Sequence, residues 1–552
     1  MKRIWQKQYE KAVPLDIDPS VYNSIVDLLE ESFDKFGSKT AYVNMGGQLS
    51  YSELDRLSRD FAAYLQQSLC LKQGDRVAIM MPNLIQYPVA LFGVLRAGMV
   101  AVNVNPLYTP RELEHQLKDS GAKAIVILEN FAHVLQKAID NTAVKNVIIT
   151  RIGDMLPFLK SKIVNLVVKH VKKMVPDWRI ANHDVLLNSL KAGANKTFNR
   201  PEIKSEDTAF LQYTGGTTGV AKGAILTHRN IVSNVLQAKA WVGHHFIEGE
   251  EIVITPLPLY HIFSLTANCL FMTVMGGTNV LITNPRDIPN FVKELKKWRF
   301  TFITGVNTLF GGLLNNPEFA QLDFTSMKIA LGGGMAVTQA VAQKWTKVTG
   351  KVLLEAYGLT ETSPAACINP ANLKEFNGCI GLPIPSTDIK IIDEDEKEVK
   401  LGEAGELCFK GPQVTQGYWN KPEDTKNLFT GDGWLKTGDI ASLDKLGFVK
   451  IVDRKKDMIL VSGFNVYPNE VEDVVTLMEG ILEAAVVGIP DEKSGEAVKL
   501  FVVKKDPNLT KEAVLAHCKE NLTGYKRPKE IEFKDELPKT NVGKILRRAL
   551  RQ

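Results

Sequence analysis

The sequence predicts an α/β protein: a large N-terminal domain of stacked αβ layers with mostly parallel sheets, followed by a small α+β C-terminal domain. Three observations support this prediction. The chain has 552 residues, which exceeds the size of one ordinary domain. Over the first 200 residues, apolar strand-like runs alternate with helical patterns, which is typical of parallel αβ layers. A different pattern of strands, one helix and a basic tail ends the chain.

The individual elements follow from local signals. The strand-like runs of the N-terminal part are Asp75–Met81, Val100–Asn105, Ala124–Leu128 and Val147–Thr150. Between them, Thr109 suits an N-cap, Pro110 the first helical position and Glu112 a capping box, so a helix is expected there. The C-terminal part predicts strands at Ala484–Ile489 and Val498–Val503 and a helix from Lys511. The charge-dense run Asp453–Asp457 precedes this pattern, although a solvated turn explains such a run equally well. The expected domains are residues 1–453 and 454–552.

The composition is that of an ordinary folded protein. Apolar residues make up 45% of the chain, charged residues 23%, and the net charge is +5, which gives no support for nucleic-acid binding. The six cysteines include no Cys-x-x-Cys pair, so reduced thiols are expected rather than disulfides or a zinc site. The N-terminus lacks the apolar core of a signal peptide and no segment is a convincing membrane span, so a cytoplasmic location is expected.

Residues Leu159–Met174 form a basic amphipathic pattern. Apolar residues recur there at helical spacing, and lysines occupy much of the remainder. A helix of this kind can lie on an anionic surface, so one expectation is peripheral contact with the inner face of the cytoplasmic membrane. The commoner arrangement is a helix that packs against its domain and leaves a solvated lysine face.

The segment Tyr213–Gly223 reads Y-T-G-G-T-T-G-V-A-K-G and suits a loop that wraps phosphate. Glycines let backbone N–H groups approach anionic oxygens, threonine hydroxyls add donors, and Lys222 adds positive charge. The apolar run before it and the helix-opening residues from Thr227 predict a strand–loop–helix context. The spacing of a Walker A loop is absent, and a flexible glycine-rich turn is the alternative.

Four further motifs carry residues suited to a nucleotide, although each alone has a plainer explanation. The triplet Gly332–Gly334 lets a flat ligand approach a strand end, or simply permits tight packing. In Tyr357–Thr362, Glu361 offers the oxygen ligand that Mg²⁺ prefers, or belongs to a surface turn. Asp439 can accept hydrogen bonds from ribose hydroxyls. Lys544 follows a glycine near the C-terminus, in what is otherwise a basic tail.

In this order the motifs resemble those of the adenylate-forming superfamily, which includes acyl-CoA synthetases, peptide-synthetase adenylation domains and beetle luciferases. The resemblance extends from about residue 25 to the C-terminus. The run Asp432–Ile459 is similar to the fatty acyl-CoA synthetase signature. The stretches V-N-V-N-P-L-Y-T-P, L-I-T-N-P-R-D-I-P and I-T-G-V-N-T-L-F resemble bacterial long-chain fatty acid–CoA ligases.

The resemblance implies a β-rich subdomain in the large domain, a mobile C-terminal domain and a two-step reaction. ATP and a long-chain fatty acid, with Mg²⁺, first give an acyl-adenylate and pyrophosphate; the thiol of coenzyme A then displaces AMP. The first step brings anionic groups together, so it needs placed positive charge and in-line positioning. Lys544 matches the family lysine that bridges the carboxylate and the α-phosphate.

The resemblance also implies roles for individual residues. Thr360 contacts the α-phosphate, Glu361 and Thr217 surround Mg²⁺, and Lys456 is the hinge of the small domain. The other implied ATP-binding residues are Thr214, Gly215, Gly216, Thr217, Thr218, Gly219 and Lys222 at the β- and γ-phosphates, Gly332, Gly333, Gly334, Tyr357 and Gly358 at the adenine, and Asp439 and Arg454 at the ribose. The implied fatty-acid site comprises Tyr260, His261, Phe263, Leu265, Gly305 and Val306, and the coenzyme A route Ser462, Gly463 and Phe464.

One departure concerns the acyl pocket, because Leu265 stands where some long-chain relatives carry a gating tryptophan. A gate of that kind, and a chain-length ruler based on it, are therefore not implied. Three other classes are the alternatives: an adenylating enzyme that uses a carrier protein or a short or aromatic acid, a non-catalytic lipid-binding or uptake protein, and a P-loop kinase or ATPase. The missing Walker pattern disfavours the last class. Association as a homodimer is left open.

Overall fold

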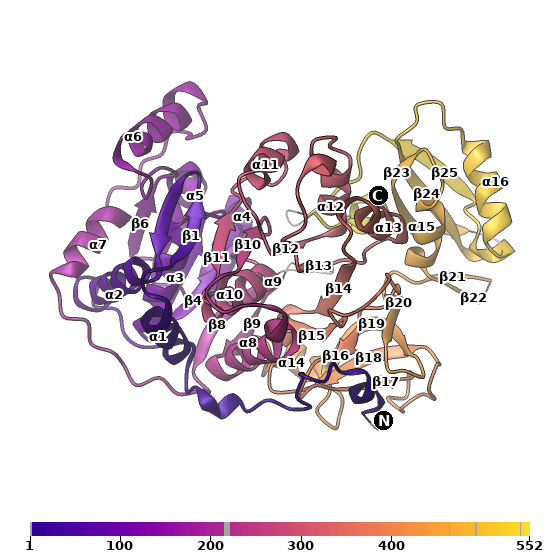
Figure 1. The fold of residues 1–552 in the computed structure, drawn as a ribbon, viewed down its shortest axis with the longest axis horizontal. Coiled ribbons are helices and arrows are strands. Elements are labelled where there is room, and N and C mark those ends of the chain that lie inside the picture. The colour runs from indigo at the N-terminus through magenta and orange to yellow at the C-terminus, as the bar shows by residue number, and fades with distance from the viewer. Residues whose placement is uncertain (1–2, 215–220, 463, 492–493, 541–542, 552) are drawn as a thin grey trace.

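The computed structural model describes residues 3–214, 221–462, 464–491, 494–540 and 543–551, which form four sheets with surrounding helices (Figure 1). In the first sheet, β9 runs antiparallel to β8 and the other paired strands are parallel. Its strands, in order across the sheet, are β7 (Asp184–Val185), β6 (Asn146–Thr150), β5 (Ala124–Leu128), β3 (Arg76–Met80), β4 (Val100–Asn103), β8 (Thr208–Thr214) and β9 (Lys222–Thr227). Every residue of β5 is buried, as expected for a parallel strand covered on both faces.

A nine-stranded sheet carries the centre of the fold. The strands from β14 to β1 pair in parallel, and antiparallel strands extend the sheet at both edges. In order across the sheet, the strands are β16 (Leu382–Pro383), β15 (Ala365–Ile368), β14 (Leu353–Gly358), β13 (Ile329–Gly333), β12 (Phe302–Gly305), β10 (Ile252–Thr255), β11 (Thr278–Leu281), β1 (Thr40–Asn44) and β2 (Gly47–Ser50). Parallel strands present their carboxyl ends at one edge, where α/β proteins bind ligands.

Two smaller sheets complete the molecule. An antiparallel sheet consists of β17 (Asp388–Ile392), β18 (Gly405–Lys410), β19 (Leu435–Leu443) and β20 (Val449–Arg454). The sheet of the C-terminal domain consists of β22 (Phe464–Val466), β21 (Ile459–Val461), β24 (Gly495–Lys504), β23 (Ile481–Asp491) and β25 (Glu530–Lys534). The expected domain boundary falls at the end of β20, between these two sheets, and stays a prediction.

Helices connect the parallel strands, as crossover connections require. Capping boxes fix the starts of four helices, α1, α2, α4 and α8. Their N-cap residues are Ser24, Ser50, Thr109 and Thr227. The helices of the large domain are α1 (Ile25–Phe36), α2 (Tyr51–Gln67), α3 (Gln86–Arg96), α4 (Pro110–Ser120), α5 (Ala132–Ala138), α6 (Phe158–Leu166), α7 (Leu186–Ala194), α8 (His228–Val242), α9 (Ile262–Ser264), α10 (Phe271–Val274), α11 (Ile288–Leu295), α12 (Asn307–Leu314), α13 (Gln339–Thr349) and α14 (Pro422–Leu428). The C-terminal domain adds α15 (Pro468–Thr476) and α16 (Lys511–Asn521).

The predicted fold class is confirmed: the large domain contains mostly parallel sheets, and a small α+β domain follows. Helix α4 begins at Pro110 with the predicted capping box, and α16 begins at Lys511. The strand–loop–helix expectation after Tyr213 is wrong in one respect, because Lys222–Thr227 forms β9 before α8 begins. This segment contains the apolar run Ala-Ile-Leu, and it pairs antiparallel with β8.

The amphipathic segment forms α6, which continues into a π-helical turn at Val167–Val171. In Figure 1 this helix projects from the body of the fold. Polar contacts, such as the ion pair between Lys169 and Glu129, join the segment to its domain. Apolar packing of the expected kind is not observed, since the large apolar side chains are 51–73% exposed. These residues are Phe158, Leu159, Ile163, Leu166, Val171 and Met174. Among the residues that the structure describes, every helix is too short or too polar to cross a bilayer.

The packing of α7 on α2 gives a testable prediction. A Cβ atom at Gly193 would lie 1.8 Å from the backbone oxygen of Asp60, and backbone cannot yield as a flexible side chain can. We expect Gly193→Ala to lower the free energy of unfolding by about 1–3 kcal/mol, through overpacking. Urea unfolding followed by circular dichroism measures this change. Gly431→Ala is the control, since a Cβ there meets no atom within 4 Å; equal midpoints for the two variants would contradict the packing.

Candidate active site

A cavity of 1270 Å³ lies where the large domain meets the C-terminal domain. It brings together most of the predicted site residues that the structure describes, although they come from distant parts of the sequence. Those that line the cavity are Thr214, Lys222, His261, Phe263, Gly333, Gly334, Tyr357, Gly358, Thr360, Glu361, Asp439, Arg454, Lys456 and Lys544. The convergence of so many predicted residues makes this cavity the candidate active site.

The ends of two parallel strands form one wall of the cavity. Strand β13 ends at Gly333 and the neighbouring β14 ends at Gly358. A Cβ atom at Gly333 would lie 2.9 Å from the Phe263 ring, and Gly334 has a φ angle of +77°. Only glycine fits both positions without strain, so the wall stays flat beside the Tyr357 ring.

Asp439 is the acidic centre of the site. The hydroxyl of Tyr357 donates to Asp439 Oδ2 at 2.5 Å, and Arg454 Nε lies 3.4 Å from Oδ1. The antiparallel register of β19 and β20 places Asp439 opposite Arg454. Burial raises the pKa of Asp439, and the positive charge of Arg454 opposes this shift. The pairing therefore favours the charged form of a buried carboxylate where ribose hydroxyls could bind.

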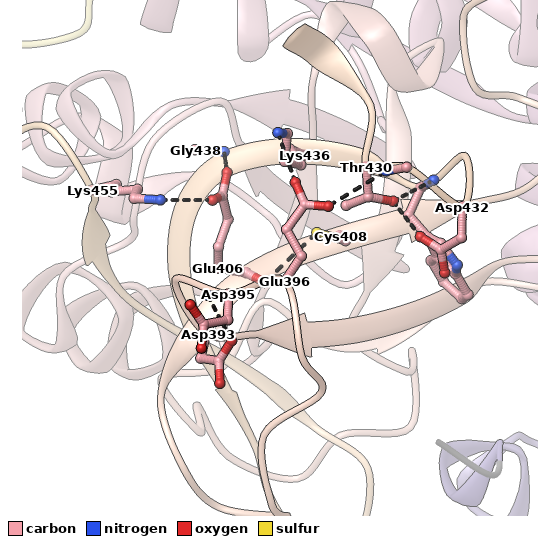
Figure 2. A network of polar contacts seen from close by, with 12 residues as sticks. Asp393, Asp395, Glu396, Glu406, Cys408, Thr430, Asp432, Lys436, Gly438 and Lys455 are labelled. Carbon is pink, nitrogen blue, oxygen red and sulfur yellow. Dashed lines mark hydrogen bonds and ion pairs between the residues drawn. The ribbon is translucent and has the colours of Figure 1, made fainter. Parts of the chain in front are cut away.

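Glu406 on β18 contacts both segments of this strand pair at the same end, as Figure 2 shows. The Gly438 amide donates to Glu406 Oε1 at 3.1 Å, and Lys455 Nζ lies 3.1 Å from Oε2. Gly438 directly precedes Asp439, and Lys455 directly precedes the expected hinge residue Lys456. One carboxylate thus accepts a hydrogen bond from the backbone next to the acidic centre and pairs with the side chain next to the hinge. No motif in the sequence signalled Glu406.

Lys544 reaches the cavity from a tight turn in the C-terminal tail. The amide of Gly543 donates to Thr540 O at 2.9 Å, and the amide of Lys544 donates to the Thr540 hydroxyl at 3.0 Å. The hydroxyl of Thr308, in α12 of the large domain, donates to Gly543 O at 3.3 Å. This contact joins the tail to the large domain and places the Lys544 side chain in the cavity.

The charges of the site perturb one another. Burial, aided by the charge of Arg454, lowers the pKa of Lys544 to about 8, while Asp439 and Glu361 act in the opposite direction. Burial and the nearby Lys544 charge lower the pKa of His261 to about 3, so this imidazole is neutral at physiological pH. A buried amine near its titration point is suited to binding anionic groups.

Glu361 and Lys222 are held by partners that the sequence did not reveal. The hydroxyl of Tyr418 donates to Glu361 Oε1 at 2.5 Å. Lys222 forms an ion pair with Asp424 in α14, and its Nζ lies 5.4 Å from the centre of the Tyr418 ring. Both predicted residues are therefore oriented by the segment that follows β18.

Sequence motifs did not indicate two other features of the cavity lining. The Glu355 carboxyl accepts a hydrogen bond from the Val337 amide at 2.8 Å, and burial raises its pKa to about 8. Helix α8, helix α10, strands β12, β13 and β15, and the loop before β16 supply apolar lining residues that no motif indicated. These residues are Ala238, Val242, Phe271, Phe302, Ile329, Leu331, Ile368 and Ile380.

Several predicted residues are not among those that line the cavity. They are Tyr260, Leu265, Gly305, Val306, Gly332, Ser462 and Phe464. Leu265 is completely buried in the core. Phe464 is 57% exposed and stacks on Tyr525, with ring centres 4.8 Å apart. Gly215, Gly216, Thr217, Thr218, Gly219 and Gly463 lie outside the described residues.

Comparison with known proteins identifies the family. The AMP-binding enzyme model matches residues 29–419, and the model of the AMP-binding enzyme C-terminal domain matches residues 470–544. A long-chain-fatty-acid–CoA ligase from Escherichia coli O6:H1 is 59% identical over 100% of this chain and 98% of its own length. The long-chain-fatty-acid–CoA ligase from Bacillus subtilis is 40% identical over 99% of this chain and 97% of its own length.

A solved structure gives the same result. The crystal structure of ATP-bound MatB from Rhodopseudomonas palustris matches with a TM-score of 0.81 at 29% identity, covering 95% of this chain and 98% of MatB. The matched family models cover both the large domain with its strand-end wall and the C-terminal segment that carries Lys544. The chain therefore belongs to the AMP-binding enzyme family.

Proposed function

We propose that this protein joins a long-chain fatty acid to coenzyme A, using ATP and forming AMP and pyrophosphate through an acyl-adenylate. The position of Lys544 carries the proposal, because the C-terminal tail brings its amine into one cavity with Asp439 and Glu361. Family membership and the full-length similarity to long-chain-fatty-acid–CoA ligases support it.

In the first step, the carboxylate of the fatty acid attacks the α-phosphorus of ATP, and pyrophosphate leaves. Two anionic groups must meet, so the ammonium of Lys544 stabilises the charge that they share. The hydroxyl of Thr360 lines the same cavity and would donate to the α-phosphate. Asp439 and Arg454 would hold the ribose, and the Tyr357 ring would lie against the adenine.

The residues present also fit Mg²⁺. The Glu361 carboxylate lines the cavity, is 9% exposed and is fixed through one oxygen by Tyr418. Carboxylate oxygen is the donor that this hard cation prefers, and Mg²⁺ usually completes its octahedron with water and phosphate oxygens. When bound there, the ion would neutralise phosphate charge; Thr217 is proposed as a second ligand.

The apolar part of the lining would receive the alkyl chain. Val242 and Phe271, on α8 and α10, and Ile329 on β13 line the cavity with His261, whose neutral imidazole would face the carboxyl group. The alkyl chain would therefore lie between helices α8 and α10 and strands of the central sheet. Burial of each CH₂ group contributes about 0.8 kcal/mol, which favours long acids over short ones.

The second step requires a different placement of the C-terminal domain. We place the domain boundary between residues 453 and 454, with Lys456 as the hinge. A turn about this hinge would withdraw Lys544 and bring the hairpin of β21 and β22, with Ser462 and Phe464, toward the acyl-adenylate. The thiolate of coenzyme A would then attack the acyl carbon and release AMP.

We also propose that α6 and its π-helical turn bind the surface of an anionic membrane. The six exposed apolar side chains of this projecting segment are accompanied by exposed lysines. These are Lys160, Lys162, Lys169, Lys172 and Lys173. Apolar side chains that enter the headgroup region and lysines that contact anionic lipid form a complementary pair of interactions. The proposed substrate is itself a lipid, so this contact would bring the enzyme to a membrane that contains fatty acid.

Removal of the Lys544 amine tests the proposed chemistry. With ATP and palmitate, the wild-type protein is expected to form AMP and pyrophosphate only when the acid is present. Lys544→Ala should slow adenylation about 10²–10³-fold, because the stabilising charge is lost. The variant should retain thiolysis of supplied palmitoyl-adenylate. Chromatography of nucleotides measures both steps. Lys534→Ala, at a partly exposed lysine of β25 that does not line the cavity, serves as the control. ADP as the product would refute the assignment.

The lowered pKa of Lys544 predicts a pH dependence. Deprotonation above about pH 8 removes the cation, so kcat/KM for ATP should fall as pH rises through this value. Bound phosphates favour the protonated amine, so the descending limb of kcat should lie at higher pH. Rapid-quench measurements of pyrophosphate release between pH 6 and 10 give both profiles. A kcat/KM for ATP that stays constant across this range would contradict the role of the amine.

Vesicle binding tests the membrane proposal. The wild-type protein should float with phosphatidylglycerol vesicles and bind less well to neutral phosphatidylcholine vesicles or in high salt. Leu159→Asp combined with Ile163→Asp should abolish flotation without changing the adenylation of dissolved palmitate. Leu515→Asp on α16 is the matched control, since Leu515 is also an exposed leucine. Undiminished flotation of the α6 variant would refute the assignment of this surface.

A further inference from the structure

The N-terminal segment before α1 crosses from the antiparallel sheet to the end of α8. Arg3 Nε lies 2.6 Å from Asp388 Oδ1 on β17, and Trp5 is completely buried. The Tyr9 hydroxyl donates to the backbone oxygen of Pro383 at 2.5 Å, and its ring meets Trp241 of α8 edge-on at 4.9 Å. These contacts fix the backbone immediately before Glu10, which points its side chain at the end of α8.

At that end two consecutive histidines converge on the carboxylate of Glu10. His244 Nε2 lies 3.2 Å from Glu10 Oε2, and His245 Nε2 lies 3.0 Å from the same oxygen. Both histidines belong to the short 3-10 helix Gly243–His245 that follows α8, and their ring centres are 4.1 Å apart. The backbone amide of Asn372 donates to the other carboxylate oxygen, Oε1, at 3.3 Å.

The three donor atoms have the chemistry of a transition-metal site. All lie within 4.8 Å of one another, and the side chains of Glu10, His244 and His245 are 12%, 25% and 30% exposed. Two imidazoles and one carboxylate suit Zn²⁺, whereas Mg²⁺ prefers an all-oxygen shell. The Asn372 amide orients the carboxylate from outside, as the second shell of metal sites does. The partial exposure leaves a path for the ion and room for a water ligand.

We propose that Glu10, His244 and His245 bind one Zn²⁺ ion, which fastens the N-terminal segment to the end of α8. In this state each neutral imidazole carries its proton on Nδ1 and coordinates the ion through Nε2. The bound ion would link the N-terminal segment, which is anchored to the antiparallel sheet at Arg3, to the end of α8. Two residues of α8, Ala238 and Val242, line the cavity. The inference uses no residue of the proposed reaction and does not depend on that function.

Zinc binding by the full-length, tag-free protein tests this site. The measurements use a Cys70→Ser background, because Cys70 is the exposed thiol of this chain. After treatment with a chelator, isothermal titration should show one equivalent of Zn²⁺ per chain, unaffected by millimolar Mg²⁺. The combined substitutions His244→Ala and His245→Ala should remove this equivalent, and Glu10→Gln should weaken it. His170→Ala, an exposed imidazole on the turn after α6, should leave it unchanged.

Two further measurements separate metal binding from a hydrogen-bonded cluster. Zn²⁺ should raise the thermal unfolding temperature of the background protein but not that of the double histidine variant, whose metal-free circular dichroism spectrum should be unchanged. Co²⁺ in place of Zn²⁺ should give a visible absorption band that Glu10→Gln alters. If the background protein binds no Zn²⁺, or if the double histidine variant keeps the equivalent and the thermal shift, the proposal is wrong.

Discussion

The candidate site depends on the burial of one amine, that of Lys544, away from water. Lys544 belongs to the C-terminal tail, but Asp439 and Glu361, the carboxylates that favour its charge, belong to the large domain. The cation is therefore compensated only when the tail turn is docked, an arrangement to which the contact from Thr308 to Gly543 contributes. Removing a charge from water is costly unless opposite charge is close, so domain placement and the protonation of this amine are linked.

The need to compensate a buried charge also explains the contacts around Asp439. Register between β19 and β20 sets its distance from Arg454, and the end of β14 supplies the Tyr357 hydroxyl. Glu406 accepts a hydrogen bond from the amide of Gly438, which precedes Asp439, and pairs with the side chain of Lys455 beside the proposed hinge. Strands from two different sheets thus contact one carboxylate, Asp439, close to the residue where the chain is proposed to turn.

Sequence reasoning succeeded where a signal is local. The capping box at Thr109 and the strand Ala124–Leu128 depend on neighbouring residues, and the structure reproduces both. Motif residues such as Asp439 also line one cavity, as the resemblance implied. Tyr418, Glu406 and Val242 could not be found in this way, because each meets the other residues of the site only through contacts between distant parts of the sequence. For the same reason the completely buried Leu265, which lies within the expected acyl segment, is absent from the observed lining.

Three of the cations that line the cavity already have carboxylates nearby in the absence of substrate. Lys222 contacts Asp424, Arg454 contacts Asp439, and Lys544 is compensated by carboxylates of the large domain. An incoming triphosphate must therefore exchange protein carboxylates for its own oxygens, and its net gain is smaller than the sum of the new ion pairs. A ligand that contacts Lys544 gains this interaction only in the docked arrangement, so it shifts the population toward docking. Under the proposed function, the loss of pyrophosphate removes part of that bias, which is the physical reason for the small domain to turn after adenylation and not before.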